Sequence, residues 1–218
     1  ALTREVETLK GRVAARQATE DAVYRTLSRR VEELEASLSD ARDEAAKDAL
    51  TGLANRRSFD RALSRCLARA ARGEFAFTLA MIDIDDFKKI NDVHGHPIGD
   101  RVLMCVATVL STGVRTNDLV ARYGGEEFAI LLEQAEVAQA REKLQQLIDG
   151  VAQSYEYEYD GQPRSVAFSF SIGATDYRLG DTGDTMTKRA DDALYQAKRK
   201  GKKRLEVSPS PLLKRIFG

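Results

Sequence analysis

The pattern of hydrophobic and polar positions divides the chain into a long polar helix and a following region of mixed elements. Residues 2–48 contain no proline and one glycine, and their apolar positions recur at steps of three and four. That spacing is typical of a heptad seam. The seam residues are Val6, Leu9, Val13, Val23, Leu27, Val31, Leu34, Leu38, Ala41 and Ala45. We predict a parallel homodimeric coiled coil over residues 1–47, with a single helix folded back on its own domain as the alternative.

The seam of this helix is irregular. Two four-residue steps follow each other between Val23 and Val31, and Arg16, Glu20 and Arg30 interrupt the apolar stripe. Such a stutter locally unwinds a supercoil. We therefore expect a coil that can change register and carry a signal, with a sensor domain upstream of it in the full-length protein.

After residue 48 the pattern changes to alternating helices and strands. Amphipathic patterns predict helices over residues 56–72, 101–114, 136–154 and 184–201, and a short polar helix with a loop in residues 86–100. Apolar runs predict strands over residues 75–85, 165–177 and 202–207, and a hairpin over residues 119–133. This order favours an α/β (α+β sandwich) fold around a mixed central sheet. We place the domain at residues 48–207 and a tail at residues 208–218.

Composition and charge narrow the functional classes. The 218 residues are 43% hydrophobic, and 34 Lys and Arg balance 34 Asp and Glu. Zero net charge argues against a general nucleic-acid or membrane-surface binder. Cys66 and Cys105 show no metal or disulfide spacing and are expected to be buried thiols. We found no membrane-length apolar run and expect a cytoplasmic location.

An acidic hairpin tip is the first candidate for chemistry. Gly124 and Gly125 precede Glu126 and Glu127 between two strand-like runs. We expect the glycines to supply the positive φ of a tight turn. Adjacent carboxylates repel each other unless a cation lies between them, which favours a divalent metal. An acidic turn that is simply solvated is the alternative.

A second carboxylate points to the same metal. Asp83 lies near the end of a buried strand, where a carboxylate is costly unless it is paired or metal-bound. If that strand neighbours the hairpin, Asp83, Glu126 and the carbonyl of Ile84 form an oxygen site, which favours Mg²⁺ over zinc. His94 and His96 lack acidic or cysteine partners at zinc spacing, so we expect a structural role for them.

Several basic residues are candidates for phosphate binding. Lys88, Lys198 and Lys202 could contact a triphosphate, and the main-chain NH groups of residues 85–89, DDFKK, could cradle it. Taken alone, each lysine is more often simply part of a solvated surface.

Five motifs in order give the chain a family resemblance. They are DALTGLANRR, IDIDDFKKINDVHGHPIGD, RYGGEEF, SIGAT and ADDALYQAKRKGK. Over residues 48–207 the chain resembles the bacterial GGDEF-domain diguanylate cyclases, in the GGEEF variant. The resemblance implies a sheet similar to the palm of nucleotidyl cyclases and polymerases. It also implies that a homodimer condenses two GTP into cyclic di-GMP and two pyrophosphates.

The resemblance also assigns roles to residues. Mg²⁺, with Mn²⁺ as an alternative, would be held by Asp83, the carbonyl of Ile84, Glu126 and Glu127. The implied catalytic residues are Glu126, Glu127 and Lys88. The implied GTP ligands are Phe87, Lys88, Asn91, Asp100, Arg122, Gly124, Gly125, Lys198 and Lys202. Among them Asn91 and Asp100 would bind the guanine edge, which adenine cannot match.

The resemblance further implies a site for the product. Arg115 and Asp118 match an RxxD site that binds cyclic di-GMP and inhibits the enzyme. The arginine that often completes this site from a later helix is not evident, apart from Arg141. Lys202 stands where many family members carry arginine, so it keeps the charge without the planar fork.

Two alternatives to the enzyme remain at this point. The domain could be a silent receptor for GTP or cyclic di-GMP, or the coil could be the functional part and scaffold an inert domain. The intact metal, phosphate and base-reading residues favour the enzyme over both.

Overall fold

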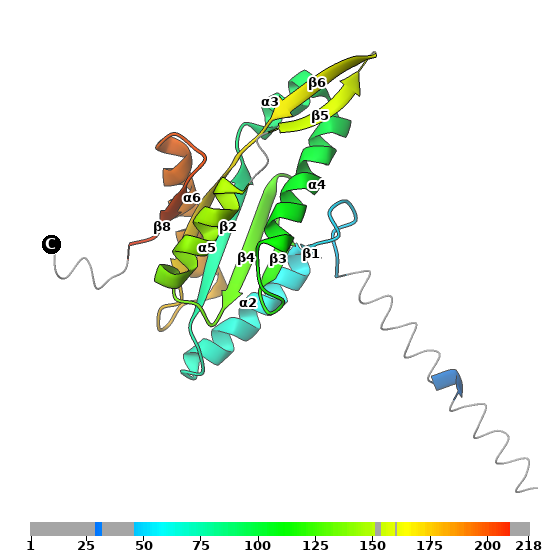
Figure 1. Cartoon of the computed structure of the whole chain (residues 1–218). Helices are drawn as coiled ribbons and strands as arrows, with labels where there is room; N and C mark the ends of the chain where they lie inside the picture. The colour runs from blue at the N-terminus through cyan, green and yellow to red at the C-terminus, as the bar shows by residue number, and fades with distance from the viewer. Residues whose placement is uncertain (1–28, 32–45, 151–153, 160, 210–218) are drawn as a thin grey trace, which may run out of the picture. The chain divides into compact units, whose positions relative to one another are not determined.

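The computed structural model describes residues 29–31, 46–150, 154–159 and 161–209 (Figure 1). The chain separates into two units, residues 1–45 and residues 46–218. In the first unit residues 29–31 are helical. The rest of the predicted coiled coil up to residue 45, and residues 210–218 of the predicted tail, lie outside the described residues. Within the described ranges, no helix has the length and apolar character needed to cross a membrane.

A six-stranded mixed sheet forms the centre of the second unit (Figure 1). Its order is β1-β3-β4-β2-β7-β8. The central strand β2 is antiparallel to both neighbours, β4 and β7, while β1 pairs parallel with β3 and β8 parallel with β7. The strands are β1 (Ala54–Asn55), β2 (Phe77–Ile84), β3 (Leu119–Arg122), β4 (Glu127–Glu133), β7 (Phe170–Asp176) and β8 (Leu205–Val207). The predicted mixed sheet is confirmed.

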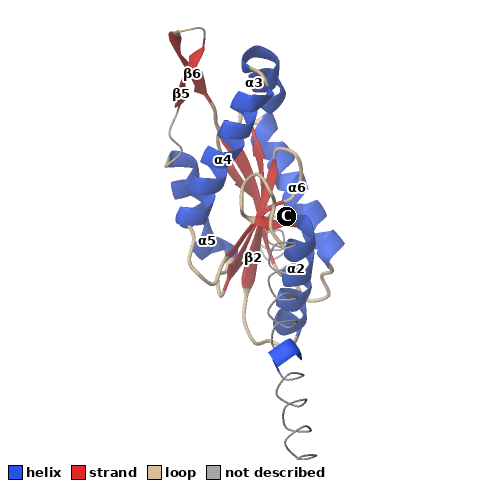
Figure 2. Cartoon of the chain, turned by 90° about the vertical axis from the view of Figure 1, so that its right-hand side faces the viewer, coloured by secondary structure: helices blue, strands red, loops and turns tan. Residues whose placement is uncertain are grey.

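Helices cover both faces of this sheet (Figure 2). Helices α4 and α5 lie on one side, and α2 and α6 lie on the other. Side chains of β2 alternate between the two layers: Ala80 and Ile82 face the α4 and α5 layer, while Leu79 and Met81 face α2 and α6. The helices are α2 (Arg56–Ala71), α3 (Phe87–His94), α4 (His96–Thr112), α5 (Val137–Asp149) and α6 (Gly183–Arg199). Burial on both faces explains why β2 is continuously apolar.

Helix α6 packs unusually close to the sheet at one point. Gly173 on β7 faces it, and a Cβ at this position would collide with the main chain of Ala190 and Leu194. The absence of a side chain therefore lets α6 approach β7, and this approach fixes where Lys198, near the end of α6, reaches the sheet.

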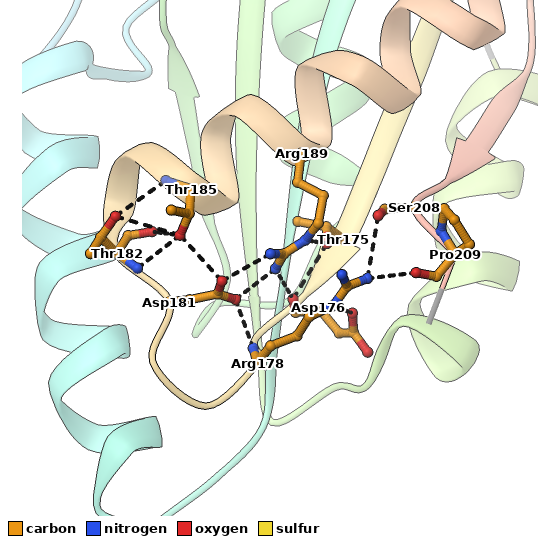
Figure 3. A network of polar contacts seen from close by, with 9 residues as sticks. All are labelled: Thr175, Asp176, Arg178, Asp181, Thr182, Thr185, Arg189, Ser208 and Pro209. Carbon is orange, nitrogen blue, oxygen red and sulfur yellow. Dashed lines mark hydrogen bonds and ion pairs between the residues drawn. The ribbon is translucent and has the colours of Figure 1, made fainter. Parts of the chain in front are cut away.

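A polar network locks the start of α6 onto the end of β7 (Figure 3). The guanidinium of Arg189 donates to both carboxylate oxygens of Asp181, at 2.8 and 2.6 Å, and to Thr175 Oγ1 at 2.7 Å. Arg178 joins this network through its main-chain NH, which donates to Asp181 Oδ2, and its Nη2 contacts Ser208 beyond β8. The bidentate pair joins α6 to the loop that follows β7, and Arg178 extends the network to Ser208 after β8.

The structure differs from the sequence prediction after α5. The predicted helix over residues 136–154 ends at Asp149, and the predicted strand over residues 165–177 is divided between β6 and β7. Strands β5 (Ser154–Tyr159) and β6 (Gln162–Ala167) form a separate hairpin that projects beyond the main sheet (Figure 1). Gly161, at φ +67°, forms its turn. The predicted helix over residues 101–114 begins earlier, at His96, with Pro97 in its first turn.

Candidate functional site

The acidic hairpin tip lies beside the end of β2. Asp83 pairs across the ladder with Glu127, and the main-chain NH of Ile84 donates to the carbonyl of Glu126 at 3.3 Å. The adjacency of Asp83 to the hairpin, on which the metal site depends, is therefore present. The end of β2 and the start of β4 thus bring together three carboxylates, from Asp83, Glu126 and Glu127.

The glycines of this hairpin act differently from the prediction. Neither Gly124 nor Gly125 is among the residues with positive φ, so the expectation that they supply a left-handed turn is wrong. A Cβ on Gly124 would collide with Glu127 Oε2, whereas the same position on Gly125 has nothing within 4 Å. A side chain at position 124 would displace the flexible end of Glu127, whereas Gly125 leaves the tip open.

One lysine approaches these carboxylates. Lys198 Nζ lies 2.5 Å from Asp83 Oδ1, although no hydrogen bond of good geometry satisfies this buried oxygen. Burial raises the pKa of Asp83, and it outweighs the opposing effect of Lys198. Burial and the neighbouring Asp83 charge likewise raise the pKa of Glu126. The site therefore holds more negative charge than Lys198 neutralises.

This donor set suits a hard divalent cation. Burial raises the pKa of Asp83 and Glu126 because it makes the ionised forms costly, and a bound divalent ion would offset that cost with its positive charge. Asp83 Oδ1, a side-chain oxygen of Glu126 and the carbonyl of Ile84 are the oxygen ligands that Mg²⁺ prefers. In the described part of the chain, no three acidic, histidine or cysteine side chains converge on one point. A metal here would therefore need main-chain, water or substrate oxygens as well.

Asp85 has a structural role that the sequence reasoning did not assign. Its side chain accepts hydrogen bonds from the hydroxyls of Ser169 and Ser171, both at 2.7 Å, and from the main-chain NH of Lys203 at 3.1 Å. The residue is only 6% exposed. These bonds satisfy the buried carboxylate and tie the turn that follows α6 to the turn that follows β2.

The turn between β2 and α3 carries the candidate phosphate cradle. Asp86 is the N-cap of α3 in the left-handed region, at φ 54°, and its side chain does not cap the helix. Instead its Oδ2 lies 2.5 Å from Lys202 Nζ and its Oδ1 lies 2.9 Å from Lys89 Nζ. The hydrogen bond from Lys202 has the largest effect on the pKa of Asp86. Together with the bond from Lys89, it lowers this pKa to about 2. Lys202 thus reaches this turn, while Lys88 is exposed on α3.

The predicted base-reading residues lie where α3 and α4 meet. Asn91 Oδ1 is buried without a hydrogen-bond partner, and a Cβ on Gly99 would collide with it. Phe87 lies against the same position and is buried in the core. Asp100 follows Gly99 on α4 and is exposed. An unpaired amide oxygen in a buried position is costly, so a ligand that donates to Asn91 would be stabilised there.

Arg122 is held within the protein. Its Nη1 contacts both carboxylate oxygens of Asp48, at 3.2 and 3.3 Å, and its Nη2 donates to the carbonyl of Gly125 at 2.7 Å. Burial raises the pKa of Asp48, but bonds from Thr51 and then Arg122 outweigh it, and the pKa is lowered. Arg122 therefore connects the first residues of the domain to the acidic hairpin. Its predicted contact with GTP stays a prediction.

The RxxD residues line a cavity on the other end of β4. Asp118 accepts from the main-chain NH groups of Arg115, at 2.9 Å, and Glu133, at 3.1 Å. Lys143 on α5 lines the same cavity of about 440 Å³. Arg141, which the sequence offered as the completing residue, lines a different cavity. Lys143 is a basic residue two positions further along the same helix.

Comparisons with known proteins identify the family of this chain. A family model described as diguanylate cyclase, GGDEF domain matches residues 45–204. The chain is 40% identical over 171 residues to diguanylate cyclase DgcP of Pseudomonas aeruginosa, covering 78% of this chain and 25% of that protein. It is 39% identical over 161 residues to response regulator PleD of Caulobacter vibrioides, covering 72% of this chain and 35% of that protein. The chain therefore spans about a quarter to a third of these relatives.

Solved structures give the same result. The coiled coil and GGDEF domain of DgcB from Caulobacter crescentus, in complex with c-di-GMP, matches with a TM-score of 0.78 and 33% identity, over 86% of this chain and 98% of that one. The active GGEEF domain of a diguanylate cyclase from Vibrio cholerae matches with a TM-score of 0.64 and 31% identity, over 72% of this chain and 99% of that one. Since the family model covers well over half of the sequence, the chain belongs to the GGDEF-domain diguanylate cyclase family.

Proposed function

We propose that this chain is a diguanylate cyclase that joins two GTP molecules into cyclic di-GMP with release of two pyrophosphates. The observation that carries the proposal is the meeting of Asp83 with Glu126 and Glu127 on adjacent strands, beside Lys198. Family membership and relatives named diguanylate cyclases support the same reaction. In this reaction the 3′-hydroxyl of each GTP attacks the α-phosphate of the other.

Asp83, the carbonyl of Ile84 and Glu126 would hold Mg²⁺, and Glu127 would add negative charge beside them. Bound there, the ion supplies charge for the leaving pyrophosphate and makes the attacking hydroxyl more acidic. Lys198 already lies at this end of β2 and would move from Asp83 to a phosphate oxygen. Lys88, Lys202 and the first NH groups of α3 would bind the remaining phosphate charge.

Asn91 and Asp100 would select guanine. A carboxylate and an amide oxygen accept hydrogen bonds from the N1–H and 2-amino groups of guanine, and adenine has neither group in that position. The buried, unpaired Oδ1 of Asn91 supports this role. Gly99 leaves room for that amide, and Phe87 packs behind it.

A homodimer would bring two such half-sites together. Residues 1–47 would form the parallel coiled coil that holds the pair, and a change of coil register would align or separate the two hairpins. Residues inserted before Asp48 should then change turnover greatly and GTP affinity little. Equal turnover for every insertion length would rule out this form of control.

Cyclic di-GMP would inhibit through the second cavity. Arg115 and Asp118 would contact the product, and Lys143 would supply the cation from α5 in place of the arginine that the family often uses there. Asp118 already accepts two main-chain bonds, so it is fixed in position for such a contact. Lys143→Gln should raise the product concentration that gives half-inhibition, and an unchanged value would remove Lys143 from this site.

Chromatography of the nucleotides formed from GTP and Mg²⁺ by the whole chain tests the proposal. We expect cyclic di-GMP, and a loss of roughly 100-fold or more in its formation for Glu126→Gln. Glu158→Gln, which removes an exposed carboxylate of β5, is the matched control and should retain the parent rate. GTP binding without product by a dimeric parent would contradict the enzyme and favour a silent receptor.

A further inference from the structure

The carboxylate of Asp86 is paired with Lys202, the cation that the proposed phosphate site would use. Lys202 Nζ lies 2.5 Å from Asp86 Oδ2, and Lys89 Nζ lies 2.9 Å from Asp86 Oδ1. These contacts bring two lysines to one carboxylate at the start of α3. In the proposed function Lys202 binds the triphosphate, so the aspartate and the nucleotide require the same ammonium group.

The conformation of Asp86 favours this arrangement over ordinary helix capping. An aspartate at an N-cap usually accepts from a main-chain NH of the first turn. Asp86 instead has a left-handed backbone, at φ 54°, and makes no side-chain capping bond. The first turn of α3 therefore has no capping carboxylate, and the carboxylate is directed to the lysines. The first NH groups of α3 and the Lys202 ammonium group lie at the same helix end.

The turn that carries Lys202 is itself held in a strained form. Lys202 and Lys203 have φ values of 62° and 46°, in the left-handed region that residues other than glycine rarely occupy. Two aspartates fix it: Asp85 accepts from the Lys203 NH at 3.1 Å, and Asp86 pairs with the Lys202 side chain. Asp85 is buried and has three donors, whereas Asp86 is exposed with surface lysines as its partners. Of these two contacts, the one between Asp86 and Lys202 can be exchanged for a contact with another anion.

We infer that Asp86 is a positioning residue that competes with the triphosphate of GTP for Lys202 and sets the affinity of the site. The inference rests on the proposed function, because it takes the triphosphate as the incoming anion. The helix dipole favours both the Asp86 carboxylate and the triphosphate at the N-terminus of α3. Because both groups are negatively charged, they repel each other there. In the free protein the carboxylate keeps Lys202 at the turn; with nucleotide bound, the phosphate replaces it.

Binding of a non-hydrolysable GTP analogue with Mg²⁺, measured by calorimetry on the whole chain, tests this inference without turnover. Asp86→Asn should bind the analogue about fivefold more tightly, and the gain should shrink as salt rises. In a Lys202→Gln background, the same substitution should give a smaller gain, because the contested cation is absent. In turnover, Asp86→Asn should lower KM for GTP more than it changes kcat.

The matched control is Glu206→Gln. Glu206 pairs with Lys200 at 2.8 Å near the same turn, so this variant also removes a lysine-bound carboxylate and frees a different lysine. It should leave affinity unchanged. Weaker or unchanged binding by Asp86→Asn, or equal gains for both variants, would overturn the inference. A parent that binds the analogue but forms no cyclic di-GMP would contradict the proposed function alone.

Discussion

Burial is the largest influence on the pKa of Asp83. A lysine at 2.5 Å would ordinarily lower a carboxyl pKa, yet the pKa of Asp83 is raised because the residue is withdrawn from water. The same cause, with the Asp83 charge added, raises the pKa of Glu126. Burial therefore makes the ionised forms of two neighbouring carboxyls costly, and a bound cation would offset that cost.

The base-reading role predicts a change in nucleotide preference. Asp100→Asn replaces an acceptor by a group that can also donate, so discrimination against ATP should fall by about tenfold or more. Competition between GTP and ATP in turnover, expressed as a ratio of kcat/KM values, measures it. Asp92→Asn, an exposed change on α3, is the control. An unchanged ratio for Asp100→Asn would remove Asp100 from guanine recognition.

The Arg189–Asp181 pair predicts a pH-dependent stability. Burial raises the pKa of Asp181, but Arg189 and the Arg178 NH outweigh it, so the folded-state pKa is lowered. Such a group stabilises the fold fully above its unfolded pKa and loses this effect as pH falls through the folded pKa. Asp181→Asn should therefore cost about 3 kcal/mol at pH 7, since Arg189 loses its buried partner.

Urea unfolding of parent and variant at several pH values measures this difference. The difference should shrink as pH falls below about 4, where Asp181 takes up a proton first in the unfolded chain and then, at lower pH, in the folded one. Asp149→Asn, near the exposed end of α5, should change stability little at any pH. A difference that is the same at pH 7 and pH 3 would assign the loss to packing rather than charge.

Single residues were predictable where a motif named them. Asp83, Glu126 and Lys198 were expected together and lie together. Asp86 and Lys143 were not assigned, because their roles depend on contacts between segments far apart in sequence. Asp86 meets Lys202 across 116 positions, and only the folded turn shows that contact.

At the scale of elements, Arg122 predicts how the hairpin is held. If its main task is to hold Asp48 and the Gly125 carbonyl, Arg122→Lys keeps the charge but loses the fork that contacts both. The hairpin would shift, and kcat should fall about tenfold with KM for GTP nearly unchanged. Asp48→Asn should have a similar effect. A large rise in KM with constant kcat would instead support a phosphate contact.

The approach of α6 to β7 predicts a contrast between two glycines. Gly173→Ala places a methyl group against the main chain of Ala190 and Leu194, so it should cost roughly 3 kcal/mol or more of stability. Gly125→Ala has open space and an ordinary φ, and it should leave stability within about 0.5 kcal/mol. Thermal and urea unfolding of both variants measure this. Equal losses would contradict the close approach of α6.

Most helices and strands were predictable from periodicity, but the β5–β6 hairpin was not. Tyr155, Tyr157 and Tyr159 alternate with acidic residues, yet they follow directly on the helical pattern of α5, which hides the boundary. The hairpin is joined to α3 by a contact of 2.6 Å between Tyr157 Oη and His94 Nδ1. A tertiary contact of this kind, and not local propensity, fixes its place.

For the molecule as a whole, the sequence predicted a mixed sheet flanked by helices, and the structure agrees. The fold class could be predicted because the order of elements leaves few arrangements for a buried central strand. The pairing of two chains could not be derived in this way. Apart from residues 29–31, the coil seam up to residue 45 lies outside the described residues. Each chain carries one acidic hairpin.

The central claim is that each active site needs two chains, because each GTP must attack the other. Parent chain is mixed with rising fractions of Glu126→Gln at constant total concentration and allowed to exchange subunits, and cyclic di-GMP formation is then measured. A dimer with one defective half-site cannot close both bonds, so turnover should follow the square of the parent fraction, to about a quarter in an equal mixture. A decline in direct proportion to the parent fraction would contradict the account.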